Sequence, residues 1–188
     1  MIKYRIKVEI EYFISLCEFD LPQLKNFNKR NFSKLREVYS NFNTKDARSV
    51  KLIEKKTNHD VKAVEYFIKQ KFNDLNIGEY SEFIHFGLTS QDINNTAIPL
   101  ILKDILKEVY FDKIDNILKA LDDKINKWKN IPMLSRTHGQ AASPTKLGKE
   151  INVFKVRIHE QLRLLKKIPI TAKFWGATGN FNAHIEAY

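Results

Sequence analysis

Apolar side chains recur every three or four positions over about thirty residues, and this stripe limits the possible folds more than any other feature. Such spacing places the side chains on one face of an α-helix. Because the stripe is longer than a typical globular helix, it predicts one long bundle helix that Pro99 either kinks or begins. The stripe consists of Ile98, Ile101, Leu102, Ile105, Val109, Ile114, Ile117, Leu118, Leu121, Ile125 and Trp128.

A second long stripe follows, and Ser143-Pro144 is expected to open its helix, since proline is tolerated at the first helical position. Two helices with one-sided apolar seams cannot bury those seams by themselves. We therefore expect an oligomer, an incomplete chain, or both. The second stripe consists of Leu147, Ile151, Phe154, Ile158, Leu162 and Leu165.

Shorter helices are predicted in the first 88 residues, where apolar positions also repeat at helical spacing. Thr57-Asn58-His59-Asp60 and Thr89-Ser90-Gln91-Asp92 both have the spacing of a capping box, which starts a helix. No segment alternates convincingly with the period of a strand. The predicted fold class is all-α: a small N-terminal helical domain over 1–88, then the start of a long-helix bundle over 89–188.

The net charge of +10 raises the question of nucleic-acid binding. The lysines are scattered over every polar face, which indicates solvated helices, so we expect no nucleic-acid partner. No apolar run is long enough to span a bilayer, so no membrane partner is expected. The absence of a signal-peptide pattern and the single cysteine, Cys17, favour a cytoplasmic protein.

Residues capable of chemistry collect at three breaks between helices. The first is Asn58-His59-Asp60, the second runs from His85 to Thr89-Ser90, and the third is Ser135-Arg136-Thr137-His138-Gly139-Gln140. Helix starts attract anions, so the first two are natural anion sites. Taken alone, Asn58, Thr89 and Ser90 could simply be caps, and His85 could be a packed side chain.

The third break is harder to explain as a mere connector between helices. His138 lies among hydroxyl, backbone and amide donors, and a histidine that titrates near neutrality is a natural general acid. Metal binding is not expected, because the chain has no second cysteine and no His-x-x-x-His pair.

Five segments together resemble the fumarase/aspartase superfamily, and they occur in the order found in that family. The Thr-His-Gly-Gln form of the fourth segment is similar to the branch that cleaves adenylosuccinate. The segments are 57–67, 81–86, 89–95, 134–140 and 176–184.

The resemblance implies β-elimination of fumarate from adenylosuccinate, giving AMP, and from the succinyl-carboxamide ribotide on the route to IMP. It implies no cofactor. It also implies that His138 is the general acid, that Asn58, His59 and Asp60 contact the nucleotide substrate, and that His85 meets its phosphate. Thr89 and Ser90 are implied to bind a substrate carboxylate.

The resemblance further implies a homotetramer whose active sites combine residues of three subunits. It implies a serine base on a later loop and an early Gly-Arg-Tyr segment, and the 188 residues contain neither. We therefore expect these residues alone to have no lyase activity. Three alternatives stay open: a superfamily lyase for another succinyl-type substrate, a non-catalytic basic helical binding module, and a decayed gene product.

Overall fold

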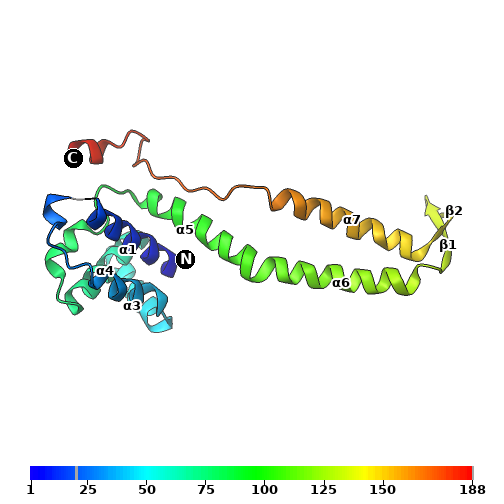
Figure 1. Cartoon of the computed structure of the whole chain (residues 1–188), viewed down its shortest axis with the longest axis horizontal. Helices are drawn as coiled ribbons and strands as arrows, with labels where there is room; N and C mark the ends of the chain where they lie inside the picture. Colours follow the sequence, from blue (N-terminus) through cyan, green and yellow to red (C-terminus); the bar gives the residue numbers. More distant parts are fainter. Residues whose placement is uncertain (20, 188) are drawn as a thin grey trace. The chain divides into compact units, whose positions relative to one another are not determined.

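The computed structural model describes residues 1–19 and 21–187, and most of them are helical (Figure 1). Two compact units divide the chain. The first combines Met1–Leu102 with residues from Thr171 onward, and the second is Lys103–Ile170. The expected all-α class is confirmed. The predicted domain division after residue 88 stays a prediction.

The first unit consists of a bundle of short helices, one of which starts at Ser90, directly after Thr89 of the second predicted capping box. The third begins at Thr44, where Asn43 and Asp46 form a complete capping box. Short 3₁₀ turns lie at Pro22–Leu24 and Gly78–Phe83. The helices are α1 (Ile2–Glu18), α2 (Asn31–Ser40), α3 (Thr44–Thr57), α4 (Asp60–Asp74), α5 (Ser90–Ile105) and α8 (Asn182–Ala187).

The core of the first unit forms where α1 and α4 bury their apolar faces. Phe13 of α1 is fully buried, and its ring meets those of Phe27 and Phe72 edge to face, with centroids 5.2 and 4.9 Å apart. Such aromatic pairs add to the stability gained from buried area. This core includes Val50 of α3 and Ala63 and Val64 of α4, so it packs α3 against the first turns of α4, where one group of candidate residues lies.

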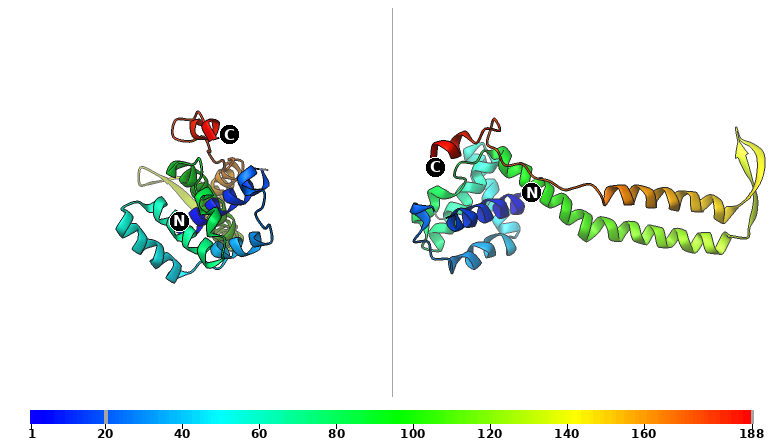
Figure 2. Two further views of the ribbon diagram at one scale, coloured as in Figure 1. Left: turned by 90° about the vertical axis from the view of Figure 1, so that its left-hand side faces the viewer. Right: turned by 45° about the horizontal axis from the view of Figure 1, so that its top comes forward.

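The second unit contains α6 (Phe111–Trp128) and α7 (Leu147–Leu165), which run side by side in opposite directions (Figure 2). A π-helical turn, Leu106–Tyr110, joins α5 to α6. Among the described apolar residues of α6 and α7, only Leu118 and Leu162 are buried. The other seam residues on these two helices are half-buried or exposed in a single chain, with Ile117 and Phe154 the most open.

Pro99 lies inside α5, which starts at Ser90, so the prediction that the long helix could begin at Pro99 is wrong. The stripe continues through α5, the π turn and α6. The helix starts earlier because Thr89 and Asp92 form a capping interaction directly before Ser90. Pro99 therefore does not occupy the first helical position.

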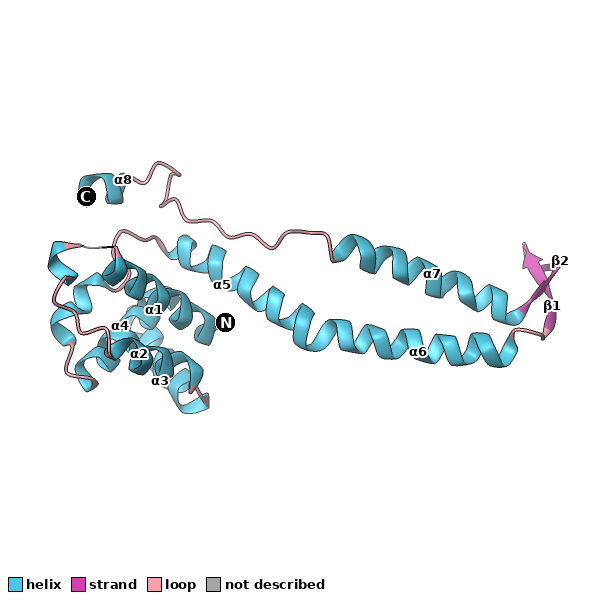
Figure 3. Cartoon of the chain, in the orientation of Figure 1, coloured by secondary structure: helices cyan, strands magenta, loops and turns pink. Residues whose placement is uncertain are grey.

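The predicted absence of strands is also wrong locally. β1 (Pro132–Thr137) and β2 (Gln140–Lys146) form an antiparallel hairpin (Figure 3). His138 and Gly139 form its turn with φ values of 50° and 77°, the positive-φ pair of a type I′ turn.

The helix expected to open at Ser143-Pro144 instead begins at Leu147, because Pro144 belongs to β2. A two-stranded ribbon has only edge strands, where proline is tolerated. No described residue of either strand is buried. The sequence therefore lacks the alternation that a half-buried strand would show.

Candidate active site

The junction between α3 and α4 carries the first predicted group. Asn58 ends α3 in the left-handed region, with φ 52° and ψ 31°. His59 caps α4, and its Nδ1 accepts the backbone N–H of Lys62 at 3.1 Å. The prediction that Thr57 is the capping residue is wrong, because Thr57 still belongs to α3 and its hydroxyl faces the carbonyl of Ile53.

The side chain of His59 reaches the second predicted group. Because Nδ1 accepts a hydrogen bond, the proton of the neutral ring lies on Nε2. Nε2 lies 3.5 Å from the hydroxyl oxygen of Ser90, the first residue of α5. The fold thus brings two helix starts together, with a ring N–H and a hydroxyl facing each other.

Asp60 is held by a residue that sequence reasoning missed. Arg5 of α1 pairs with its carboxylate, with Nη2 2.6 Å from Oδ2. Burial acts to raise the pKa of Asp60, but the hydrogen bond and charge of Arg5 outweigh it and lower the pKa. In the sequence, Arg5 stands out as a charged residue directly before Ile6, which lies on the apolar face of the first helix.

Thr89 and Asp92 form one half of the second predicted capping box. The carboxylate oxygen Oδ2 of Asp92 accepts the backbone N–H of Thr89 at 3.0 Å. The other oxygen, Oδ1, accepts the backbone N–H groups of Trp175 at 3.1 Å and Gly176 at 3.2 Å. Asp92 is only 2% exposed. Besides capping the start of α5, its carboxylate therefore forms a buried link to the segment around Trp175 and Gly176.

His85 packs against a buried acid that the sequence did not reveal as its partner. Its Nδ1 lies 2.6 Å from Oε1 of Glu9, which is 1% exposed. Burial raises the pKa of Glu9. Burial acts to lower the pKa of His85, but the hydrogen bond and charge of Glu9 outweigh it and raise the pKa. With Nδ1 engaged, Nε2 is the ring atom through which His85 can bind a ligand.

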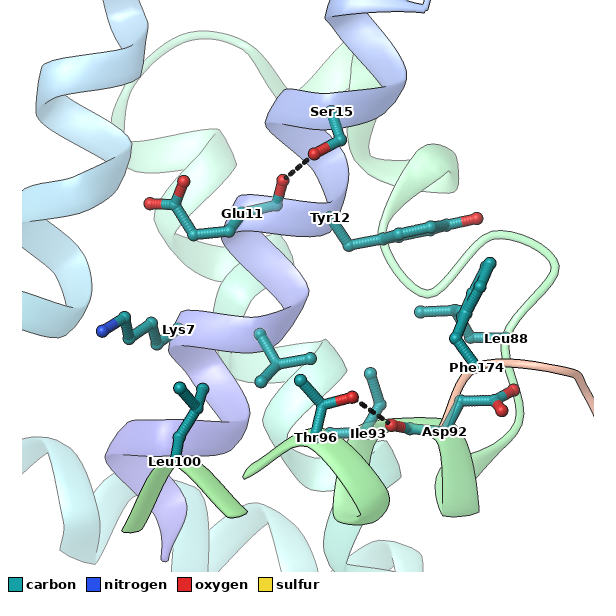
Figure 4. Close-up of a pocket in the computed structure, with 11 residues that line it drawn as sticks. Lys7, Glu11, Tyr12, Ser15, Leu88, Asp92, Ile93, Thr96, Leu100 and Phe174 are labelled. Carbon is teal, nitrogen blue, oxygen red and sulfur yellow. Dashed lines mark hydrogen bonds between the residues drawn. The ribbon is translucent and has the colours of Figure 1, made fainter. Parts of the chain in front are cut away.

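Asn58, His59 and Asp60 line a polar cavity of about 630 Å³ in the first unit. Lys51 and Lys55 also line it, and their charge favours an anionic ligand. A smaller cavity of about 280 Å³ lies between α1, the start of α5 and Phe174 (Figure 4). Its lining is mainly apolar, so it is a poorer match for an anion.

His138 lies in the second unit, on the exposed turn of the hairpin. The hairpin is braced by a hydrogen bond of 2.8 Å from the Ser135 hydroxyl to the carbonyl of Ser143. The guanidinium of Arg136 donates to the carbonyl of Gly139 at 3.4 Å. The turn therefore presents the His138 imidazole on a short, locally braced ribbon.

Within residues 1–19 and 21–187, no three histidine, cysteine or acidic side chains gather closely enough to hold a metal ion. Over the same residues, no helix combines the length and the apolar character needed to cross a membrane.

A family model described as "Lyase" matches residues 2–188. The chain is 52% identical over 194 residues to the adenylosuccinate lyase of Dictyostelium discoideum, covering 100% of the chain and 42% of that protein. It is 41% identical over 189 residues to the adenylosuccinate lyase of Buchnera aphidicola subsp. Acyrthosiphon pisum (strain APS), covering 100% and 41%. The chain thus spans about two-fifths of the length of these curated relatives.

The solved structure of a fumarate lyase from Mesorhizobium sp. BNC1 shares the fold, with a TM-score of 0.77 at 20% identity. The match covers 97% of this chain and 41% of that one. With its helical fold and the polar site between two helix starts, the chain belongs to the lyase family. Within that family, its whole length is similar to adenylosuccinate lyases.

Proposed function

We propose that the complete protein is a carbon–nitrogen lyase that eliminates fumarate from adenylosuccinate to give AMP. We also propose that the complete protein cleaves the succinyl-carboxamide ribotide in IMP synthesis by the same elimination. The observation that carries this proposal is the 52% identity, over the whole chain, to an adenylosuccinate lyase. The facing helix starts at His59 and Ser90 give the proposal a structural basis.

The elimination removes a proton from the succinyl carbon next to a carboxylate, and in this proposal the serine base that the family resemblance implies, on a loop outside these 188 residues, accepts that proton. The electron pair left behind forms the new double bond as the carbon–nitrogen bond breaks, and that bond's electrons go to the nitrogen. The nitrogen leaves poorly unless it is protonated. In this proposal, His138 gives it a proton as general acid, a step typically worth about 10²–10⁴-fold.

Negative charge develops on the substrate carboxylate during proton removal. Thr89 and Ser90 lie at the start of α5, where hydroxyl and backbone donors can stabilise that charge. In this proposal, Asn58, His59 and Asp60 contact the substrate from the start of α4, and His85 meets the phosphate. The chemistry needs neither a metal nor an organic cofactor.

We also propose that the complete protein is a cytoplasmic homotetramer whose active sites combine residues of several subunits. The open apolar seams of α6 and α7 support this assembly, because they expose side chains that further helices would bury. Phe154 is 60% exposed and Ile117 is 49% exposed. Tetramerisation would bring hairpin residues such as His138 to sites on other copies.

The test is an assay of the complete gene product with adenylosuccinate, following fumarate and AMP. We expect release of both products, and His138→Ala should lower kcat by at least about a hundredfold. His159→Ala is the matched control, since His159 is an exposed histidine on α7. No turnover of adenylosuccinate, with turnover of another succinyl compound, would reassign the substrate. Equal kcat for His138→Ala and wild type would remove His138 from the mechanism.

A further inference from the structure

Arg5 joins the two helix starts that carry the candidate site. It projects from α1, and its side chain is only 11% exposed. Its Nη2 lies 2.6 Å from Oδ2 of Asp60, at the start of α4. Its Nε donates at 2.9 Å to Oδ1 of Asn94, on the first turns of α5. One planar group therefore holds two helices at once.

The two groups that Arg5 holds lie next to the reacting region. Asp60 follows His59 in the chain, and Asn94 lies one helical turn after Ser90. His59 Nε2 and Ser90 Oγ are 3.5 Å apart. A shift of α4 relative to α5 would change that separation directly, because His59 is the N-cap of α4 and Ser90 is the first residue of α5.

Asp60 has little freedom to move independently of Arg5. Its Oδ2 is paired with the guanidinium, and its Oδ1 accepts the backbone N–H of Val61 at 2.9 Å. The guanidinium is rigid and its donors diverge in a fixed fork. The spacing of Asp60 and Asn94 is therefore set by the width of that fork.

We propose that Arg5 is a positioning residue, which fixes the start of α4 against the start of α5 and so sets the separation of His59 from Ser90. The proposal rests on the function proposed above. Arg5 does not line the polar cavity. It acts through Asp60 and Asn94, and its loss would disturb the transition-state geometry more than the binding of substrate.

The experiment compares Arg5→Met, Arg5→Lys and wild type in the complete gene product. Methionine keeps an unbranched apolar stem of similar volume to that of arginine and removes the charge and both donors. Lysine keeps the charge but places it on one nitrogen, which cannot reproduce the fork to both partners. Arg36→Met is the matched control, because Arg36 also pairs with an acid of α1, Glu11, at 2.9 Å, outside the site.

For Arg5→Met we expect kcat to fall about tenfold to a hundredfold, with a smaller change in KM, as expected for a displacement of about 1 Å. Arg5→Lys should recover part of kcat, and Arg36→Met should keep it. A kcat unchanged in Arg5→Met, or KM alone raised, would overturn the positioning role.

A second readout needs no activity. Hydrogen–deuterium exchange should speed up in Arg5→Met within peptides covering residues 59–63 and 90–95, and not in the hairpin at 132–146. Faster exchange throughout the chain would overturn the proposal and make Arg5 a general stabilising residue. If wild type fails to cleave adenylosuccinate while the local exchange result holds, the proposed function fails and the mechanical role of Arg5 stands.

Discussion

Asp92 accepts a hydrogen bond of 3.1 Å from the backbone N–H of Trp175, 83 positions later in the chain. The same oxygen accepts the N–H of Gly176 at 3.2 Å. The segment from 171 onward is thereby tied to the start of α5, where Thr89 and Ser90 lie. A buried carboxylate with both oxygens engaged is costly to disturb.

Asp92→Asn should destabilise the first unit by about 1–3 kcal/mol, because the amide turns an N–H₂ group toward N–H donors. Urea unfolding followed by the fluorescence of Trp175, in a Trp128→Phe background that removes the other tryptophan, measures the change. Asp115→Asn, an exposed site on α6, is the control and should leave the midpoint unchanged. Equal midpoints for the two variants would contradict a structural role for Asp92.

The pair of His85 and Glu9 should make stability depend on pH. Burial acts to lower the pKa of His85, yet the hydrogen bond and charge of Glu9 raise it above the ordinary value. The folded state then binds the proton more tightly than the unfolded state. The stabilisation is complete below about pH 6.5 and is lost as the pH rises through the raised pKa.

The pKa of Glu9 is also raised, by burial, so its contribution has the same sign and begins to decline at lower pH. Glu9→Gln should flatten the decline in the urea midpoint above about pH 6.5, since it removes the charge that holds the proton on His85. His159→Gln serves as the control. Parallel pH curves for wild type and Glu9→Gln would show that the pair carries no linkage.

Gly87 combines two demands that alanine cannot meet. Its φ is +70°, and an added Cβ would lie 2.9 Å from Nε2 of His184. Gly87→Ala should therefore lower the free energy of unfolding by more than about 1 kcal/mol. Gly176→Ala is a matched control in the same unit, because its φ is +75° but its Cβ would meet nothing within 4 Å.

Both substitutions place a Cβ on a backbone with positive φ. The difference between their losses in unfolding free energy therefore measures the contact with His184. Thermal unfolding of each variant provides the comparison. We expect the larger loss at Gly87. An equal loss at Gly87 and Gly176 would mean that the ring of His184 moves aside at no cost.

The open seams should control self-association of the complete gene product. Ile117→Lys together with Phe154→Lys should shift sedimentation toward smaller species, because two like charges would be buried in the contact without acidic partners. Asn116→Lys, on an already polar face of α6, should leave the assembly intact. A normal assembly in the double variant would place the subunit contacts elsewhere.

Local patterns predicted those features that depend on neighbouring residues. The helical period foretold α1, α6 and α7, and the acid three residues after Thr89 foretold the start of α5. The hairpin escaped prediction because its ribbon buries neither face. The turn chemistry of His138-Gly139 was the available signal.

The ties across the fold could not be predicted in the same way. Arg5, Glu9 and Asp92 are charged residues next to apolar stripes, which marks them as unusual but does not name their partners. Their partners are distant in the sequence: Arg5 and Asn94 are 89 positions apart, Glu9 and His85 are 76 apart, and Asp92 and Trp175 are 83 apart. Only the packed fold supplies that pairing.

The divided first unit has a consequence for how the chain folds during synthesis. Its two parts are separated by the whole of Lys103–Ile170. When α5 has been synthesised, the backbone N–H groups of Trp175 and Gly176 that donate to Asp92 have not yet been made, so the first unit cannot complete these hydrogen bonds until α6, the hairpin and α7 have been added. At about 5–20 residues per second, the residues between the two parts take several seconds to synthesise, so completion of the first unit is delayed until late in the synthesis of these residues.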